Sequence, residues 1–213
     1  MSDERITFDS DGIKLSGVLH SPPGAAPFPG VVVCHPHPLY GGNMNNNVVM
    51  AICHGLITRG IAALRFDFRG AGASEGEHGG GVAEQEDALA ALQALQRQAN
   101  VDQAHTGLAG YSFGASMALG AAPRGPDLKA LAVVAPPTPG LNNPEVLVYP
   151  QPKLILAGDL DSFVQIDQVA ALVERMKQPA ELVLLEGADQ FMVGHEEEIA
   201  RHVGEFFSKH LSA

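Results

Sequence analysis

From residue 30 onward, short apolar runs alternate along the chain with segments that have the periodicity of helices. The run at residues 30–34 is continuously apolar, which is typical of a strand buried on both faces of a sheet. Strands that alternate with helices are joined by right-handed crossovers, so parallel strands lie side by side and helices cover both faces. The pattern therefore predicts a mostly parallel, doubly wound α/β sheet.

The remaining elements follow from periodicity and from turn residues. Residues 5–10 and 14–20 alternate apolar and polar positions around Asp11-Gly12, which predicts an antiparallel hairpin at the edge of the sheet. Further strands are expected at residues 30–34, 62–66, 106–110, 129–135, 153–157 and 181–185. Helices are expected at residues 48–59, 82–98, 113–121, 166–177 and 199–210. About eight strands in one sheet use the whole chain, so we expect a single domain over residues 1–213.

Composition and charge disfavour several kinds of partner. The net charge is −11 and no basic stripe compensates for it, so nucleic acid and anionic membranes are poor partners. Apolar runs are far shorter than the ~20 residues that span a bilayer, and residues 1–10 have acids where a signal peptide has bases. Cys34 and Cys53 both lie in apolar surroundings, which predicts reduced, buried thiols. We expect a cytoplasmic globular protein, a monomer or a homodimer.

The segment at residues 110–114 reads G-Y-S-F-G and lies between an expected strand and an expected helix. In that context G-x-S-x-G is typical of a nucleophile elbow, in which a sharp turn exposes the serine hydroxyl above the sheet. The amide of Phe113, at the start of the helix, would face the oxyanion of an attacked carbonyl. A turn of small residues that merely packs closely is the alternative, but the strand and helix on either side favour Ser112 as a nucleophile.

Three more segments follow expected strands, and with the elbow they resemble the α/β-hydrolase superfamily, within it the small lidless bacterial hydrolases related to dienelactone hydrolase. These segments are CHPHPLYGG at residues 34–42, RFDFRGAGASEG at residues 65–76 and GDLD at residues 158–161. The resemblance covers nearly the whole chain. It implies an α/β-hydrolase fold and ester hydrolysis through an acyl-serine, with no metal and no organic cofactor. Only 16 residues separate Ala135 from Pro152, which leaves no room for a lid domain.

The family builds the second half of its oxyanion hole in the loop at residues 35–42. Because prolines have no N–H group, the donor there must be the amide of His37, Leu39 or Tyr40, and we favour Leu39. His35 and His37 could also face one way as a metal pair, but no nearby cluster of Asp, Glu or Cys completes such a site.

Other polar residues have structural interpretations. Arg69 is expected to hold neighbouring loop carbonyls. His78 has no motif around it and is expected to be a solvated or packed imidazole. The acidic residues 84–87 begin an expected helix, where negative charge favours the amino end.

The resemblance implies a catalytic acid after the strand at residues 153–157. The pattern G-x-x-D, counted from Gly158, selects Asp161, and Asp159 is expected to satisfy loop amides. The family then has Gly-Ala-Asp-His followed by aromatic residues. Here residues 187–192 read GADQFM, so Gln190 stands at the position of the histidine.

Glutamine can hydrogen-bond with Ser112 but has no usable basicity near neutral pH. Loss of the base costs ~10⁶ in turnover in subtilisin, so hydrolysis is expected to be impaired. Three explanations are open: His195 swings in as the base, His37 acts as an unusual base, or Gln190 is a natural loss or an introduced substitution that silences the enzyme. The otherwise complete site favours the third.

Apolar side chains in the same loops predict a shallow, open pocket that takes a small carboxylic ester. The residues expected there are His37, Tyr40, Phe163, Phe191 and Met192. Two other functions remain as alternatives: a catalytically silent ligand-binding homologue, and a hydrolase of lactones or dienelactones.

Overall fold

The computed structural model describes residues 2–212, which form one eight-stranded sheet in the order β1-β2-β4-β3-β5-β6-β7-β8. The strands are β1 (Ser2–Ser10), β2 (Ile13–Ser21), β3 (Phe28–Cys34), β4 (Ala62–Phe66), β5 (Val101–Tyr111), β6 (Ala130–Val134), β7 (Lys153–Gly158) and β8 (Ala180–Leu185). The helices are α1 (Asn47–Ile57), α2 (Ala83–Gln96), α3 (Phe113–Ala121), α4 (Thr138–Leu141), α5 (Pro144–Val148), α6 (Ile166–Arg175) and α7 (Glu196–Leu211), with short 3₁₀ turns η1 (Pro38–Tyr40) and η2 (Ala122–Arg124).

The sheet is mixed in the way that the sequence predicts. Strands β3 to β8 are parallel to one another, whereas β2 is antiparallel to both β1 and β4. The β1–β2 turn places Asp11 at φ 51° and Gly12 at φ 82°, the two positive angles of a tight hairpin turn that suits the twist of the strands. The predicted doubly wound α/β sheet with an edge hairpin is confirmed.

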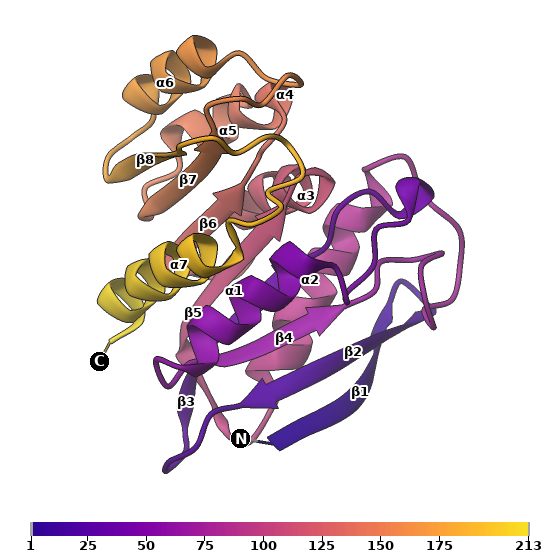
Figure 1. The fold of residues 1–213 in the computed structure, drawn as a ribbon. Coiled ribbons are helices and arrows are strands. Elements are labelled where there is room, and N and C mark those ends of the chain that lie inside the picture. The colour runs from indigo at the N-terminus through magenta and orange to yellow at the C-terminus, as the bar shows by residue number, and fades with distance from the viewer. Residues whose placement is uncertain (1, 213) are drawn as a thin grey trace.

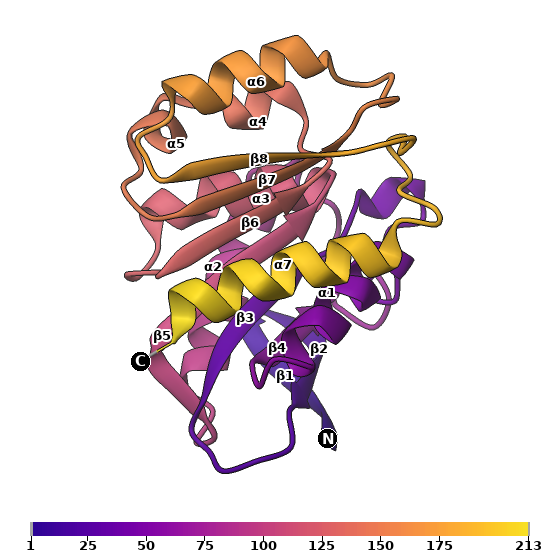
Figure 2. The same ribbon diagram turned by 60° about the vertical axis from the view of Figure 1, so that its left-hand side comes forward.

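Helices cover both faces of the sheet (Figures 1 and 2). Helices α1 and α7 lie side by side on one face, and α2, α3 and α6 lie on the other. Successive residues of β3 alternate between the two layers: Val31 and Val33 pack in the layer with α1 and α7, and Val32 packs in the layer with α2 and α3. All three valines are fully buried, which explains the continuous apolar run of this central strand.

The connection between β6 and β7 contains two short helices that the sequence analysis did not predict. Each begins at or next to a proline, and the Asn143 side chain accepts a hydrogen bond from Glu145 N at 3.0 Å to cap α5. The apolar side chains of Leu141 and Val146 are buried against the core. The connection is folded onto the body of the protein and adds no lid.

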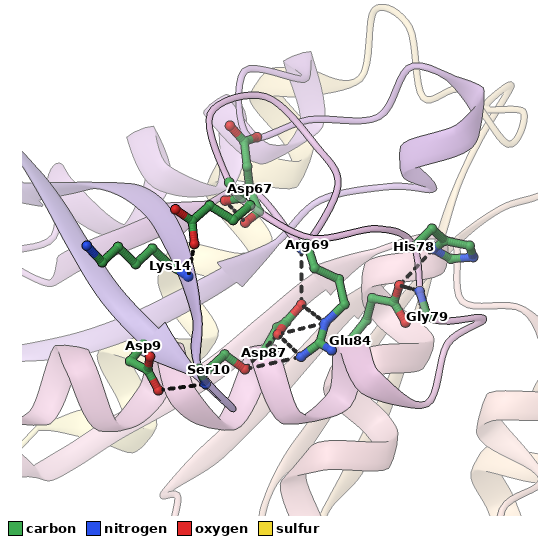
Figure 3. A network of polar contacts seen from close by, with 12 residues as sticks. Asp9, Ser10, Lys14, Asp67, Arg69, His78, Gly79, Glu84 and Asp87 are labelled. Atoms are coloured by element: carbon green, nitrogen blue, oxygen red, sulfur yellow. Dashed lines mark hydrogen bonds and ion pairs between the residues drawn. The ribbon is translucent and has the colours of Figure 1, made fainter.

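A buried polar network joins α2 to the loop after β4 and to the end of β1 (Figure 3). Arg69 Nη2 lies 2.6 Å from Asp87 Oδ1, and Ser10 Oγ donates to the same oxygen at 2.7 Å. The expectation that Arg69 holds loop carbonyls is therefore wrong, because its guanidinium pairs with a carboxylate. Asp87 is fully buried and does not serve as a solvated helix-terminal charge. Asp87 can be buried because it pairs with Arg69, which lies 18 residues away in the sequence. Local charge patterns do not reveal a pair at that separation.

Candidate active site

The tight turn between β5 and α3 carries Ser112. Ser112 adopts φ 54° and ψ −115°, a strained conformation for a residue with a side chain, and its N–H donates to Val134 O at 2.9 Å. A Cβ at Gly110 would lie 2.2 Å from Gly114 O, and a Cβ at Gly114 would lie 2.4 Å from Cys34 O. Both flanking glycines are thus required by close backbone contacts. The geometry is that of a nucleophile elbow.

The side chain of Gln190 lies between Ser112 and Asp161. In the orientation that satisfies both ends of the amide, its nitrogen donates to Asp161 Oδ2 at 2.6 Å and to Oδ1 at 3.3 Å, and its oxygen accepts from Ser112 Oγ at 2.9 Å. The reverse orientation, in which the nitrogen donates to Ser112 Oγ, turns the amide oxygen toward the carboxylate and is disfavoured. Serine, glutamine and aspartate form one hydrogen-bonded row.

The loop after β7 holds the carboxylate of Asp161 in this row. Asp161 is buried, and its Oδ1 accepts from Phe163 N at 2.8 Å. Burial raises the pKa of this carboxyl, and the nearby charge of Asp189 contributes a smaller rise. Asp159 instead accepts from Gly187 N at 2.7 Å, so it satisfies a loop amide as expected.

Tyr111 fixes the backbone that carries Gln190. Its hydroxyl donates to Gln190 O at 2.8 Å, and Asp189 Oδ1 accepts from Phe191 N at 2.8 Å in the same turn. Burial raises the pKa of Tyr111 to about 12, with a smaller effect from Asp189, so the phenol remains a donor at neutral pH. The sequence analysis did not assign this role, although Tyr111 adjoins the nucleophile.

Two backbone amides are candidates for the oxyanion hole. Phe113 opens α3, so its N–H has no partner within the helix. In the loop after β3, Leu39 N donates to His37 Nδ1 at 3.3 Å and Tyr40 N donates to His37 O at 3.1 Å, whereas His37 N donates no hydrogen bond within residues 2–212. The predicted Leu39 amide is therefore already engaged within its own loop, which leaves the His37 amide as the other candidate donor to an oxyanion.

An open pocket of about 720 Å³ surrounds the serine. Its lining residues are Pro36, His37, Tyr40, Gly41, Gly42, Asn46, Tyr111, Ser112, Phe113, Ser116, Pro137, Phe163, Val164, Gln190 and Phe191. The volume is within the ~300–1,000 Å³ typical of small-molecule sites. Four of the five predicted pocket residues, His37, Tyr40, Phe163 and Phe191, line it. Sequence reasoning missed Asn46 and Ser116, which no motif marks.

Two predicted residues lie away from the pocket lining. Met192 is fully buried in the core beside α7, because the turn closed by Met192 N and Asp189 O at 3.2 Å gives it φ 58° and directs its side chain inward. Its assignment to the pocket was wrong. His195 precedes the first residue of α7 and points to Glu198, with Nδ1 4.0 Å from Oε2. The structure does not bring it to Ser112.

His35 is occupied inside the fold. Its Nδ1 donates to Pro36 O at 2.6 Å, and its Nε2 accepts from Phe68 N at 3.0 Å. Both ring nitrogens are used, so His35 and His37 do not form a metal pair. In residues 2–212 no three or more His, Cys, Asp or Glu side chains gather as a metal site. No helix in that range is long and apolar enough to cross a membrane.

A pair of imidazoles packs against the elbow from the side of the glycine-rich loop, which comprises residues 70–81. The ring of His37 lies 4.6 Å from that of Phe113 and 4.9 Å from that of His78, centroid to centroid. His78 Nδ1 is 2.7 Å from Glu84 Oε1, which also accepts from Gly79 N at 2.6 Å (Figure 3). Burial lowers the pKa of His37, and the neighbouring His78 lowers it further, so both effects favour the neutral imidazole. His78 is therefore a packed imidazole, one of the two roles expected for it, and Glu84 lies in the first turn of α2 as expected.

Comparison with known proteins places this arrangement in a family. A model of the X-Pro dipeptidyl-peptidase (S15) family matches residues 11–180, which is most of the chain and includes Ser112 and Asp161. The chain belongs to the S15 family. The matched stretch ends before Gln190, so the family assignment itself is independent of the residue at the base position.

Sequence relatives of this S15-family chain cover most of its length, and solved structures share its fold. An uncharacterised protein of Rickettsia prowazekii is 36% identical over 186 residues, covering 84% of this chain and 78% of the relative. A structure described as an alpha-beta serine hydrolase homologue from Coxiella burnetii has a TM-score of 0.85 and 32% identity over 96% of this chain and 97% of that chain. A serine hydrolase without a lid from Xanthomonas campestris has a TM-score of 0.88 and 28% identity over 100% and 97% of the two chains. The chain is a lidless α/β-hydrolase homologue, as its motifs predict.

Proposed function

We propose that this chain is a serine hydrolase of small uncharged carboxylic esters, in which Gln190 holds turnover far below that of a complete triad. The observation that carries the proposal is the hydrogen-bonded row of Ser112, Gln190 and Asp161 at an open pocket of about 720 Å³. A strained serine, two candidate oxyanion amides and a buried carboxylate are arranged as acyl transfer requires.

The proposed reaction begins when Ser112 Oγ attacks the ester carbonyl. The carbonyl π bond opens to an oxyanion, which the N–H groups of Phe113 and His37 stabilise. The tetrahedral intermediate collapses, the bond to the alkoxy group breaks, and an acyl-serine remains. Water then attacks the acyl-serine and releases the acid.

The rate of this reaction depends on how readily the Ser112 hydroxyl loses its proton. An imidazole takes that proton as Oγ attacks and returns it to the leaving alkoxide. The Gln190 amide oxygen accepts the hydrogen bond of Ser112 Oγ at 2.9 Å but does not become protonated near neutral pH. The proton must pass to water, so both acylation and deacylation are slow.

The pocket favours esters over peptides. The family's name indicates peptide hydrolysis for its X-Pro dipeptidyl-peptidases. Peptide hydrolysis requires an acid that protonates the departing amine, and Gln190 is not such an acid. Among residues 2–212, those that line the pocket include no Asp or Glu to receive the terminal ammonium of a peptide. An alkoxide leaves more readily and needs no such partner.

Gln190 also favours a second candidate, a protein that binds an ester or a related ligand without turning it over. The complete elbow and oxyanion amides support catalysis instead, because binding alone needs no strained serine. Lactones and dienelactones contain the same reacting group as open-chain esters and belong to the same proposal.

Turnover of a short-chain p-nitrophenyl ester tests the proposal. We expect a low rate from this chain, no rate above buffer from Ser112→Ala, and a large gain from Gln190→His that Ser112→Ala abolishes in the double variant. If Gln190→His binds the ester but gains no serine-dependent rate, the chain is a binding protein. A high serine-independent rate would refute the acyl-serine mechanism.

A further inference from the structure

Aromatic side chains form two groups in the lining of the pocket. In the loop after β3, the rings of His37 and Tyr40 lie 4.8 Å apart, centroid to centroid. In the loops after β7 and β8, the rings of Phe163 and Phe191 lie 6.5 Å apart with an interplanar angle of 89°. All four residues line the pocket that contains Ser112. Three separate loops thus bring aromatic rings to one cavity.

Three of these rings are open to solvent. Tyr40 is 87% exposed, Phe163 is 72% exposed and Phe191 is 60% exposed. A single exposed apolar side chain is common on protein surfaces, but a group of them around a cavity indicates a binding site. Their apolar area gains free energy when a ligand removes it from water.

The pocket is also without formal charge. Among residues 2–212, its lining includes no Lys, Arg, Asp or Glu, and Asp161 lies behind Gln190 rather than in the lining. The net charge of −11 disfavours anionic ligands at long range. These properties favour an uncharged ligand with a large apolar group.

We propose that this pocket selects uncharged esters that carry an aromatic ring, held between the Phe163 and Phe191 rings on one side and the His37 and Tyr40 rings on the other. The proposal rests on the function proposed above, because Ser112 marks where the ester carbonyl lies. Aromatic rings prefer offset and edge-to-face contacts, which a saturated ring of similar size does not make. A preference of about three- to tenfold for the aromatic ring corresponds to such contacts.

Matched ester pairs test the selection. In the Ser112→Ala chain, which prevents turnover, calorimetry compares phenyl butanoate with cyclohexyl butanoate, and methyl benzoate with methyl cyclohexanecarboxylate. The first pair places the ring in the alcohol part and the second places it in the acyl part. We expect at least one aromatic ester to bind about three- to tenfold more tightly than its saturated counterpart.

Variants then assign the preference to the rings. Phe163→Leu with Phe191→Leu, and separately Tyr40→Leu, keep apolar side chains but remove the rings, and we expect the aromatic preference to fall toward one. Val193→Ala is the matched control, because Val193 is 75% exposed and lies outside the pocket lining. It should leave the preference unchanged.

Each contrary result has a distinct meaning. Equal binding of aromatic and saturated esters overturns the selection but leaves the ester site in place. A preference that survives both leucine variants overturns the assignment to these rings. If no ester binds, both this inference and the proposed function fail. If sedimentation shows a dimer that the leucine variants dissociate, and no aromatic preference exists, the rings are a contact between two copies of the chain and the proposal is wrong.

Discussion

In the site that we propose, Gln190 makes hydrogen bonds to both Ser112 and Asp161 but has no usable basicity near neutral pH. A neutral histidine at this position donates from one ring nitrogen to the acid and accepts from the serine at the other. The Gln190 amide does the same, with its nitrogen on Asp161 and its oxygen toward Ser112 Oγ. Because both partners stay satisfied, the loops need not rearrange. Under this proposal the site remains assembled but has no proton acceptor at residue 190.

The Asp161 carboxyl has a raised pKa because it is buried. At pH values between the ordinary Asp pKa and the raised pKa of folded Asp161, the folded chain therefore binds more protons than the unfolded chain. As pH rises through this range, the carboxyl progressively lowers the free energy of unfolding. We predict that Asp161→Asn raises the free energy of unfolding at pH 7, and raises it less at pH 4. The asparagine can still accept from Phe163 N, and Gln190 can reverse its amide to accept from the new NH₂ group.

Urea denaturation at the two pH values measures this difference. Asp167→Asn is the control, because Asp167 is exposed in the first turn of α6 and its removal should not stabilise the chain. A destabilised Asp161→Asn chain at pH 7 would show that the charged carboxylate supports the fold instead.

At the scale of elements, the start of α2 stabilises the glycine-rich loop. Glu84 is fully buried, and its two oxygens accept from Gly79 N at 2.6 Å and from Gly81 N at 2.8 Å. The same carboxylate pairs with His78, whose ring lies 4.9 Å from that of His37 and 5.6 Å from that of Phe113. One helix terminus thus supports a wall of the active site.

We predict that Glu84→Gln lowers the free energy of unfolding by about 1–3 kcal/mol, because glutamine offers one acceptor and turns an NH₂ group toward a backbone N–H. Glu86→Gln on the same helix is the control. Glu86 pairs with Arg124 on the surface, so its loss should cost no more than about 1 kcal/mol. Equal effects of the two variants in urea denaturation would contradict a structural role for the buried carboxylate.

Local patterns predicted the elements well and the polar contacts between them poorly. The strand at residues 62–66 and the helix at residues 113–121 are as predicted, because apolar periodicity and glycine positions are local signals. Strand β5 begins at Val101, earlier than expected, because Val101 pairs with Phe28 at the start of β3, before a register shift and the mostly polar residues 102–105. The roles of Arg69 and Glu84 depend on partners that packing brings together, which no local pattern encodes.

In the candidate site, too, the positions of key residues were easier to predict than the directions of single groups. Motifs with fixed spacing marked Ser112 and Asp161, and the structure brings both to Gln190. The direction of single groups was harder to predict: the Leu39 amide turns to His37, and Met192 turns into the core. Such directions depend on one or two backbone angles in a loop, so composition and spacing do not determine them.

At the scale of the whole molecule, the two thiols lie in cores on opposite faces of the sheet. Cys34 packs with α2 and α3, and Cys53 packs with α1 and α7. Burial raises the pKa of Cys53 to about 12 and raises that of Cys34 further above its ordinary value. Both thiols are free. The reactivity of each thiol therefore measures how readily its own layer of the fold opens.

If residues 1–213 unfold as one cooperative domain, both thiols should react with Ellman's reagent at the same slow rate, set by global unfolding. The variants Cys34→Ser and Cys53→Ser each keep one thiol. We predict that these two thiols react with the reagent at equal rates in native buffer at pH 8, once the rates are corrected for the measured stabilities of the variants. Immediate reaction of both thiols is expected in guanidinium chloride. A much faster rate for one thiol would show that one layer opens independently, against a single domain.

The dependence of kcat/KM on pH tests the central claim most directly, namely that the chain has every part of a serine hydrolase except the base. We predict that Gln190→His gains a serine-dependent rate of about 10³-fold or more, which rises with pH as one group near the ordinary histidine pKa of ~6.5 loses its proton. The unsubstituted chain should show no such rise. If the unsubstituted chain already shows this rise with pH, and Gln190→His changes neither kcat/KM nor its pH dependence, another residue is the base and the account is wrong.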